Sequence, residues 1–445
     1  MAALRCPTEW DPETGHTYVQ ASHVERGGVK VLRGTNLLAV AGFNQAVVLD
    51  SIRRSVDGMS RVELAGTTGL SAQTVSNVSR RLLDQGLIRE AGTQIDGPGK
   101  PRTILQLEPR SGYAIGVHMD PAVVTCVLLD LEGSVVAHSR MRTTLSADAN
   151  DTVAKTAMAV DALIATSAVS RERVLGLGVA APGPIDSERG VLVRPPLILN
   201  WSNFPVRDTL STATGLPVLV AKDVTAAAVA ERWTNTVAPS RNFIFVYYGT
   251  GIGVGLVLND EVFTGASQNA GDIGHVQVDP DGSLCNICGR RGCFGESVRP
   301  YQLVKLAIEL GVLSAPASEL DFDLVDDMFT KLTMAADRGD VVAQSIIDRS
   351  IHNTATFLTN VANLLDIDRI VFGGPFWARV ASRYLEKLPE YLRELTTNNL
   401  IHPVKIAGCV VGEDVAAVGA ACLVLDETFS PHSSRLLIRT GGARA

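Results

Sequence analysis

The spacing of apolar residues changes near Pro109. Before that point they recur every three or four positions, as in amphipathic helices, whereas after it short apolar runs alternate with helical stretches. The first pattern predicts a small helical module and the second an α/β region. Residues 1–42 show no sustained period and are interpreted as an N-terminal tail or arm. Residues 431–445 are expected to form a C-terminal tail.

Three helices are predicted in the module at residues 43–108. The first begins at Asn44, and the second follows Ser60-Arg61-Val62-Glu63, a capping box whose hydroxyl and carboxylate satisfy free backbone N–H groups. Ser71 caps the third helix and Gly86 ends it. Two strands, Leu87–Ala91 and Thr103–Leu107, flank a Gly/Pro-rich loop, which completes a predicted winged helix-turn-helix.

One face of the third helix is apolar, because Val75, Val78 and Leu82 follow helical spacing, and its other faces are polar. Asn and Gln can pair with adenine edges and Arg with guanine or phosphate, while basic groups in the wing loop can reach the minor groove. Polar helix faces are common, but the helices, the wing and the local charge together favour DNA binding. The predicted DNA-binding residues are Ser71, Gln73, Thr74, Ser76, Asn77, Arg80, Arg81, Lys100 and Arg102.

Charge is unevenly distributed along the chain. The formal net charge is -7, but the segment from Lys30 to Gln106 carries +4 and the remainder -11. A basic module on an acidic body fits a DNA-binding domain joined to another function. No apolar run approaches the ~20 residues of a membrane span, and the first residues lack a secretory pattern. We therefore expect a cytoplasmic protein without membrane insertion.

Beyond Pro109 the alternation of strands and helices predicts an α/β fold. The predicted strands are Tyr113–Val117, Val123–Asp130, Val174–Ala180, Val218–Val220, Phe243–Tyr248, Val254–Leu258 and Arg369–Phe372. The predicted helices are Thr152–Val169, Thr225–Thr234, Pro300–Leu310 and Val341–Leu365.

Three of the seven cysteines lie within nine residues and follow a histidine in the spacing H-x9-C-x2-C-x4-C. In a cytosolic protein this cluster favours a metal over disulfides, and four Cys/His ligands are typical of structural zinc. The alternative is three buried free thiols, but cysteines this close and interleaved with glycines seldom serve that role. We predict one structural zinc ion per chain, held by His275, Cys285, Cys288 and Cys293.

Several polar motifs follow predicted strands and predict a ligand pocket. They include Ala181-Pro182-Gly183-Pro184, Leu199-Asn200-Trp201 and Asp223. The turn Gly249–Gly253 is of a kind that can hold phosphate with backbone N–H groups. Gly271-Asp272-Ile273-Gly274-His275 would bring a carboxylate beside the predicted zinc ligand. Each motif alone is weak, so their order along one chain is the informative feature.

From Asn44 to about Leu425 the chain resembles the ROK family of repressors, uncharacterised reading frames and kinases, especially its NagC, Mlc and xylose-repressor branch. The most specific shared features are Ser60-Arg61-Val62-Glu63-Leu64-Ala65 with Gly69-Leu70-Ser71, and the Gly-His and cysteine cluster. The resemblance implies an α/β fold with an N-terminal winged helix-turn-helix and a two-lobed, actin-like ATPase domain of the sugar-kinase type. It places the first lobe at 109–222 plus about 410–430, and the second, with the zinc site and a dimerisation surface, at 223–409.

The resemblance also implies a sugar site, in which kinase members use the position of Asp223 as the catalytic base. The expected ligand-binding residues are Gly183, Asn200, Lys222, Asp223, Asp272, His275 and Glu296. This chain departs from the family at Lys222 (usually Asn), at Asp272 (usually Glu), and in the zinc loop, where the cysteine pair is one residue wider and Glu296 is shifted by one.

The first phosphate loop of kinase members, Asp-x-Gly-Gly-Thr, appears here as His118-Met119-Asp120-Pro121-Ala122. Pro121 offers no backbone N–H and Asp120 would repel phosphate. We therefore predict that Asp223 is a vestigial base and that the protein is a catalytically inactive relative of the sugar kinases.

These observations predict a DNA-binding repressor of carbohydrate-related genes. It would bind double-stranded operator DNA as a homodimer or a dimer of dimers, under control of a sugar or sugar phosphate. Lys222 hints at an anionic ligand, although a structural ion pair explains it about as well. An active sugar kinase with an appended DNA-binding domain is one alternative. A repressor controlled by a protein partner, such as a sugar transporter subunit, is another.

Overall fold

The computed structural model describes residues 8–10, 17–19, 37–94, 101–142, 148–195, 201–235, 240–316, 318–395, 397 and 401–431. The chain divides into two compact units, Met1–Asn44 with Pro431–Ala445, and Gln45–Ser430. The described part of the first unit contains an antiparallel pair, β1 (Thr8–Trp10) and β2 (Thr17–Val19), and the start of helix α1 (Leu37–Arg53).

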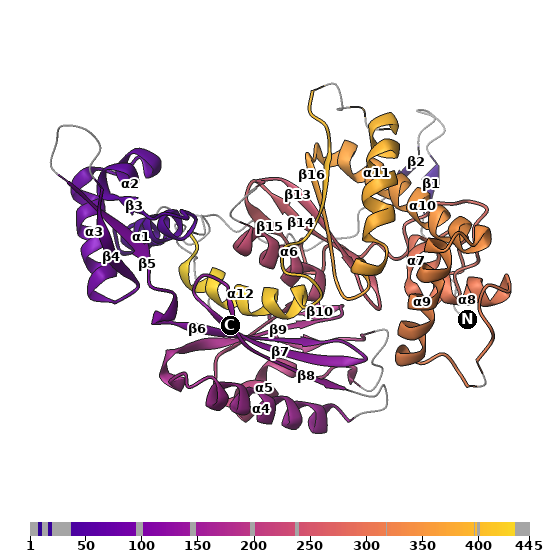
Figure 1. Ribbon diagram of the computed structural model, residues 1–445, viewed down its shortest axis with the longest axis horizontal. Helices are drawn as coiled ribbons and strands as arrows, with labels where there is room; N and C mark the ends of the chain where they lie inside the picture. Colours follow the sequence, from indigo (N-terminus) through magenta and orange to yellow (C-terminus); the bar gives the residue numbers. More distant parts are fainter. Residues whose placement is uncertain are drawn as a thin grey trace. The chain divides into compact units, whose positions relative to one another are not determined.

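A winged helix-turn-helix opens the second unit (Figure 1). Its sheet has the order β3-β5-β4, and the buried side chains of Leu64, Val75, Leu82 and Leu105 fill its core. Its elements after α1 are β3 (Met59–Ser60), α2 (Arg61–Thr68), α3 (Ala72–Asp84), β4 (Ile88–Gln94) and β5 (Arg102–Leu107).

The local signals in this module act as predicted. The Ser60 side chain accepts a hydrogen bond from the backbone N–H of Glu63, and the Glu63 carboxylate accepts one from the N–H of Ser60, so the capping box of α2 is confirmed. Ser71 caps α3. The predicted start of the first helix at Asn44 was wrong, because α1 begins at Leu37 and ends at Arg53. It passes through Gly42, a single glycine that costs a helix only about 1 kcal/mol.

Two five-stranded sheets with the same topology follow, β8-β7-β6-β9-β12 and β15-β14-β13-β16-β17. In each sheet the first three strands in chain order pair antiparallel and the last two are parallel. The strands of the first sheet are β6 (Tyr113–Met119), β7 (Val123–Asp130), β8 (Val135–Arg142), β9 (Val174–Ala181) and β12 (Val218–Lys222). Those of the second are β13 (Phe243–Tyr248), β14 (Ile252–Leu258), β15 (Glu261–Phe263), β16 (Arg369–Gly373) and β17 (Lys405–Gly408).

Two buried helices, α6 (Asp223–Thr234) and α12 (Val415–Phe429), lie against each other between these sheets (Figure 1). Helix α12 also packs on β6 and β9, and α6 packs on β13 and β14. The approach is close enough to demand glycine, because a Cβ on Gly116 would lie 1.9 Å from the Ala417 carbonyl oxygen. The result is the predicted two-lobed, actin-like α/β fold.

The remaining elements cover the outer faces of the lobes. The first lobe has α4 (Ala149–Thr166), α5 (Val206–Thr214) and a short hairpin of β10 (Ile185–Asp186) and β11 (Val191–Leu192). The second has α7 (Phe294–Val298), α8 (Pro300–Glu309), α9 (Phe322–Asp337), α10 (Val341–Leu365) and α11 (Ala381–Leu395). Within the part of the chain that the structure describes, every helix is too short or too polar to cross a bilayer.

Candidate functional site

A cleft of about 210 Å³ lies where loops from both sheets converge. The loops follow the carboxyl ends of β6, β9, β12 and β13, which is where α/β folds usually bind ligands. The polar side chains that line the cleft are Asp120, Lys222, Asp223, Tyr247, Thr250, Asn269 and Asp272. Gly183 contributes backbone to the same wall.

Asp223 is the first residue of α6 and faces the cleft. Its Oδ1 accepts a hydrogen bond from the backbone N–H of Val224 at 2.8 Å. Burial raises the pKa of Asp223, while the nearby charges of His118 and Lys222 act in the opposite direction. The carboxyl group lines the cleft, where the sequence predicts a ligand-binding role for it.

Lys222 is buried, and its ammonium group is used within the protein. The Nζ donates to the backbone oxygens of Asn269 at 3.3 Å and Ala270 at 3.4 Å. Its stem packs on Gly183, where an added Cβ would come within 2.9 Å of the lysine Cε. The ion pair considered from the sequence is not seen among the described residues. Lys222 lines the cleft and anchors the loop at 269–270.

Asn269 joins the two lobes across the cleft and was not anticipated from the sequence. Its Oδ1 accepts from the N–H of Ile185, and its Nδ2 donates to the oxygen of the same residue, both at 2.8 Å. Such a paired amide fixes the distance between two loops that are far apart in the chain. The sequence signal for this turn is the glycine at position 271, shortly after the asparagine. In the structure Gly271 has a φ of +89°, which marks a sharp turn.

The other expected ligand residues fall in different places. Asp272 lines the cleft, and His275 belongs to the cysteine cluster. Glu296, in α7, is not a lining residue; its carboxylate accepts from Arg299 at 3.2 Å and from Gln302 at 2.5 Å. Asn200 lies outside the described residues.

Two turns of the cleft lining meet at Asp120 and Thr250. The hydroxyl of Thr250 lies 3.0 Å from Oδ2 of Asp120 and 3.3 Å from Oδ1. Asp120 also accepts from the N–H of Ala122 at 2.9 Å, so its carboxylate is held by both turns. Asp120 therefore stands beside the glycine-rich turn Gly249–Gly253, where a kinase would hold phosphate.

A second cavity of about 330 Å³ adjoins this point and extends between β8 and α9. Each of its arginines pairs with a carboxylate of the cavity. The pairs are Arg140–Asp414, Arg142–Asp323 and Arg379–Asp326, each with a nitrogen–oxygen distance of 2.7 Å. His118 also lines this cavity, and its buried Nε2 has no partner among the described residues. The cavity thus offers a nucleotide few uncommitted cations.

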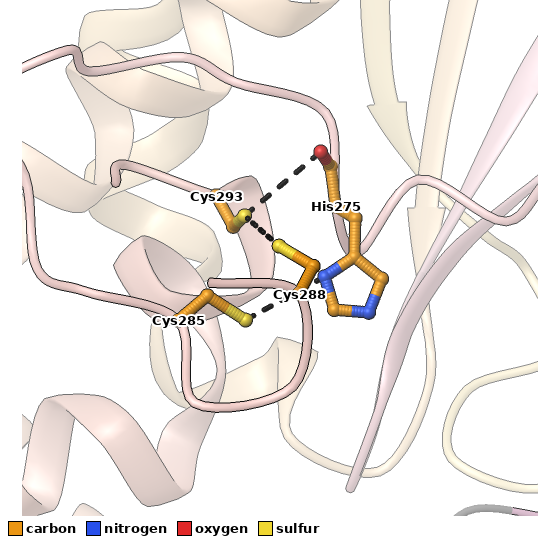
Figure 2. Close-up of side chains that lie close together, drawn as sticks. All are labelled: His275, Cys285, Cys288 and Cys293. Atoms are coloured by element: carbon orange, nitrogen blue, oxygen red, sulfur yellow. Dashed lines mark hydrogen bonds between the residues drawn. The ribbon is translucent and has the colours of Figure 1, made fainter. Parts of the chain in front are cut away.

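The predicted metal ligands come together in one cluster (Figure 2). The side-chain donor atoms of His275, Cys285, Cys288 and Cys293 all lie within 4.8 Å of one another. Figure 2 shows Nδ1 of His275 directed at the sulfur of Cys285, and the sulfurs of Cys288 and Cys293 directed at each other. The first pair of atoms is 3.6 Å apart and the second 3.3 Å. A backbone hydrogen bond from Arg290 lowers the pKa of Cys288 to about 6, which favours the thiolate. This group can hold a metal ion.

The predicted DNA-facing residues lie on the exposed side of α3. Val75, Val78 and Leu82 are buried, whereas Gln73, Thr74, Ser76, Asn77, Arg80 and Arg81 are exposed or half-buried. The Gln73 amide donates to Asn77 at 3.2 Å, and the Ser71 hydroxyl caps the helix. In the wing, Arg102 is exposed at the start of β5, and Lys100 lies outside the described residues.

The last turn of α1 contacts the far end of α6. The guanidinium of Arg53 lies over the Trp233 ring, 3.9 Å from its centroid, and donates to the Trp233 oxygen at 2.8 Å. Arg53 also pairs with Asp50 at 2.7 Å. Burial alone would raise the pKa of Asp50, but the charges of Arg53 and Arg54 hold it below its ordinary value. An ion pair from Arg54 to Asp260, at 3.0 Å, adds a second link.

The fold and its sites define a two-lobed protein of the sugar-kinase type with a DNA-binding module. The chain belongs to the ROK family, whose model matches residues 114–427. It is similar to a xylose repressor of Caldicellulosiruptor bescii, with 22% identity over 375 residues, 84% of this chain and 93% of the relative. It is also similar to a glucokinase of Halalkalibacterium halodurans, with 27% identity over 321 residues, 72% of this chain and 96% of the relative.

A solved structure of a ROK family transcriptional regulator, described as a homolog of the Escherichia coli Mlc protein, matches the fold. The TM-score is 0.71 at 24% identity, and the match covers 88% of this chain and 98% of that one. Because the match spans most of both chains, it includes the N-terminal module as well as the two lobes.

Proposed function

We propose that this protein is a transcriptional repressor whose affinity for operator DNA is controlled by a sugar bound in the cleft. The exposed polar face of α3 and the basic residues of the wing supply the DNA-binding surface. Asp223 and Asp272 supply acceptors for sugar hydroxyls. The relative named as a xylose repressor supports this role for the chain.

The observation that carries the proposal is the position of α6. Its first residue, Asp223, faces the cleft, and Trp233 near its other end contacts Arg53 of α1. A ligand that moves one lobe would displace this helix and thereby the DNA-binding module. Coupling of this kind requires that the ligand bind one of two arrangements better than the other.

The same geometry supports a regulator without kinase activity. Phosphoryl transfer depends on holding the triphosphate in line and on stabilising its charge. Here Asp120 and Pro121 stand in one phosphate turn, and the Thr250 hydroxyl of the other donates to Asp120. A base such as Asp223 contributes about 10²–10⁴-fold, and only when the phosphoryl group is in place.

We assign the cysteine cluster to structural zinc. In a tetrahedral zinc site, metal–ligand distances of about 2.1 Å to nitrogen and 2.3 Å to sulfur separate these donors by roughly 3.6 Å and two sulfurs by roughly 3.8 Å. The distance from His275 Nδ1 to Cys285 Sγ is 3.6 Å, and that between the sulfurs of Cys288 and Cys293 is 3.3 Å. All four donor atoms lie within 4.8 Å of one another, so shifts of about 1 Å would complete the tetrahedron and the donor set fits. Zinc there would brace the loop that leads from Asp272 to α7.

We further propose that the protein acts as a homodimer or a dimer of dimers. Two DNA modules related by symmetry would read half-sites about one helical turn apart, so a small rotation would lower operator affinity. Control by a sugar transporter subunit is the alternative mode of regulation.

Two assays test the proposal. Selection from a random DNA pool should yield a consensus with two half-sites. An ADP-release assay with magnesium, ATP and a panel of hexoses, hexosamines and pentoses should show no sugar-dependent turnover. Turnover near 1 s⁻¹, the low end for ordinary enzymes, that Asp223→Asn abolishes would establish the kinase alternative instead.

A further inference from the structure

The carboxylate of Asp120 contacts the glycine-rich turn Gly249–Gly253 through the hydroxyl of Thr250. Turns rich in glycine bind anions through backbone N–H groups and hydroxyls. In this chain the Thr250 hydroxyl, within the turn Gly249–Gly253, donates to both carboxylate oxygens of Asp120. The N–H of Ala122 fixes the same carboxylate from the opposite turn. An anionic side chain of the protein therefore already uses the hydroxyl donor that this turn could offer to a phosphate.

The rest of the cleft is also acidic. Asp120, Asp223 and Asp272 line it, and Lys222 is the one cationic side chain among its described lining residues. That ammonium group donates to two backbone oxygens, as described above.

His118 lines the second cavity, and its buried Nε2 has no partner among the described residues, although its charge acts on Asp223. The acidic lining of the cleft itself would repel a phosphate. Carboxylates instead accept hydrogen bonds from neutral hydroxyl groups, of which a sugar has several.

We propose that Asp120 is a specificity-determining residue that reserves the cleft for an unphosphorylated, uncharged sugar and excludes sugar phosphates. This inference rests on the proposed function and narrows its ligand class. The Asp120 carboxylate takes the place of a bound phosphate. The turn Gly249–Gly253 therefore keeps its shape but no longer binds an external anion.

The test compares free sugars with their phosphates on the full-length protein. Glucose, mannose and N-acetylglucosamine are each paired with the 6-phosphate, with xylose and inorganic phosphate alongside, first by thermal shift and then by calorimetric titration. A free sugar should bind the wild type at least tenfold more tightly than its phosphate.

Asp120→Asn should strengthen phosphate binding and so reduce the ratio of the two affinities, free sugar over sugar phosphate, at least tenfold. Asp120→Ser provides a second neutral variant if the amide disturbs folding. Asp151→Asn, an exposed helix residue paired with Lys155, is the matched control and should leave the ratio unchanged.

The outcomes distinguish the role of Asp120 in excluding sugar phosphates from the sugar-sensing function on which it rests. A phosphate that binds the wild type more tightly than its free sugar would overturn the inference and leave a sugar-responsive regulator in place. An unchanged ratio in both folded Asp120 variants would also overturn it. If none of these compounds binds, the sugar-sensing function itself fails, and the inference fails with it.

Discussion

The guanidinium of Arg53 lies 3.9 Å from the ring centroid of Trp233 and donates a hydrogen bond to that residue's carbonyl oxygen. One residue belongs to the first helix of the DNA-binding module, and the other to the helix that begins at Asp223 in the cleft. A buried cation over an aromatic ring contributes about 2 kcal/mol or more. The contact is therefore strong enough to transmit a coupling free energy of about 1–3 kcal/mol between two sites.

Arg53→Ala should uncouple the two sites. We expect the change in operator affinity caused by the ligand to fall below about twofold, from the roughly 5–150-fold range typical of coupled sites. Sugar binding in the absence of DNA should stay within about twofold of the wild type. Fluorescence anisotropy with labelled operator and calorimetry with the sugar measure the two quantities. Arg89→Ala, on the exposed side of the module, is the matched control. If the operator affinity of Arg53→Ala responds to the sugar as fully as that of the wild type, the Arg53–Trp233 contact does not couple the two sites.

Removal of the metal should destabilise the ligand lobes, because metal binding and folding are coupled. Cys288→Ser should lose bound zinc and lower the melting temperature by more than about 5 °C, since 1 kcal/mol corresponds to roughly 2–4 °C in a domain of this size. Cys409→Ser lies outside the cluster and should keep one zinc ion per chain. Elemental analysis that finds no metal in the wild type would contradict the assignment.

The recognition helix and the wing should contribute differently to DNA binding. Ala substitutions at Gln73, Asn77 and Arg80 should each cost about 1–3 kcal/mol on the selected operator and relax sequence discrimination. Lys100→Ala and Arg102→Ala should weaken binding to all sequences and reduce the slope of its salt dependence by about one. Equal losses on operator and random DNA for every variant would refute this division.

Local signals in the sequence were sufficient for the DNA-binding module. The capping box at Ser60 and the apolar stripe of α3 depend on neighbours within one or two turns, so a short stretch of sequence determines them. Helix α12 was missed because it is buried on all sides and rich in alanine, and so it lacks an amphipathic period. Strand β8 was missed because its residues are mostly exposed or half-buried, without a run of core residues.

The site was predictable only in part for a similar reason. Gly183, Asp223 and Asp272 follow strands or turns whose motifs are local, and all three line the cleft. The contact between Asp120 and Thr250 joins residues 130 positions apart, and Asn269 meets Ile185 across 84 positions. Such contacts depend on how the lobes are packed, which no local pattern specifies.

Replacing Asp223 by a neutral amide should stabilise the unliganded protein at neutral pH. Burial raises the pKa of Asp223 in the folded state above its ordinary value of 3.8, so ionisation above that value costs folding free energy. Asp223→Asn should therefore gain stability over the wild type as the pH rises through the folded-state pKa. The gain should vanish below pH 3.8, where the carboxyl is protonated in both states. Urea unfolding between about pH 3 and pH 8 measures this gain. A gain that does not depend on pH would contradict the buried-carboxyl explanation.

The central claim is that a sugar in the cleft controls DNA binding through α6. The most direct measurement is the dissociation constant for the selected operator, with and without the bound sugar, for the wild type and for Asp223→Asn. We predict a sugar-induced decrease in operator affinity of at least about fivefold for the wild type, within the range of typical coupling free energies. Asp223→Asn should bind the operator with the affinity of the unliganded wild type and show no response at the same sugar concentration. An operator affinity that is unchanged by every sugar that binds, or an equal response in Asp223→Asn, would contradict the account.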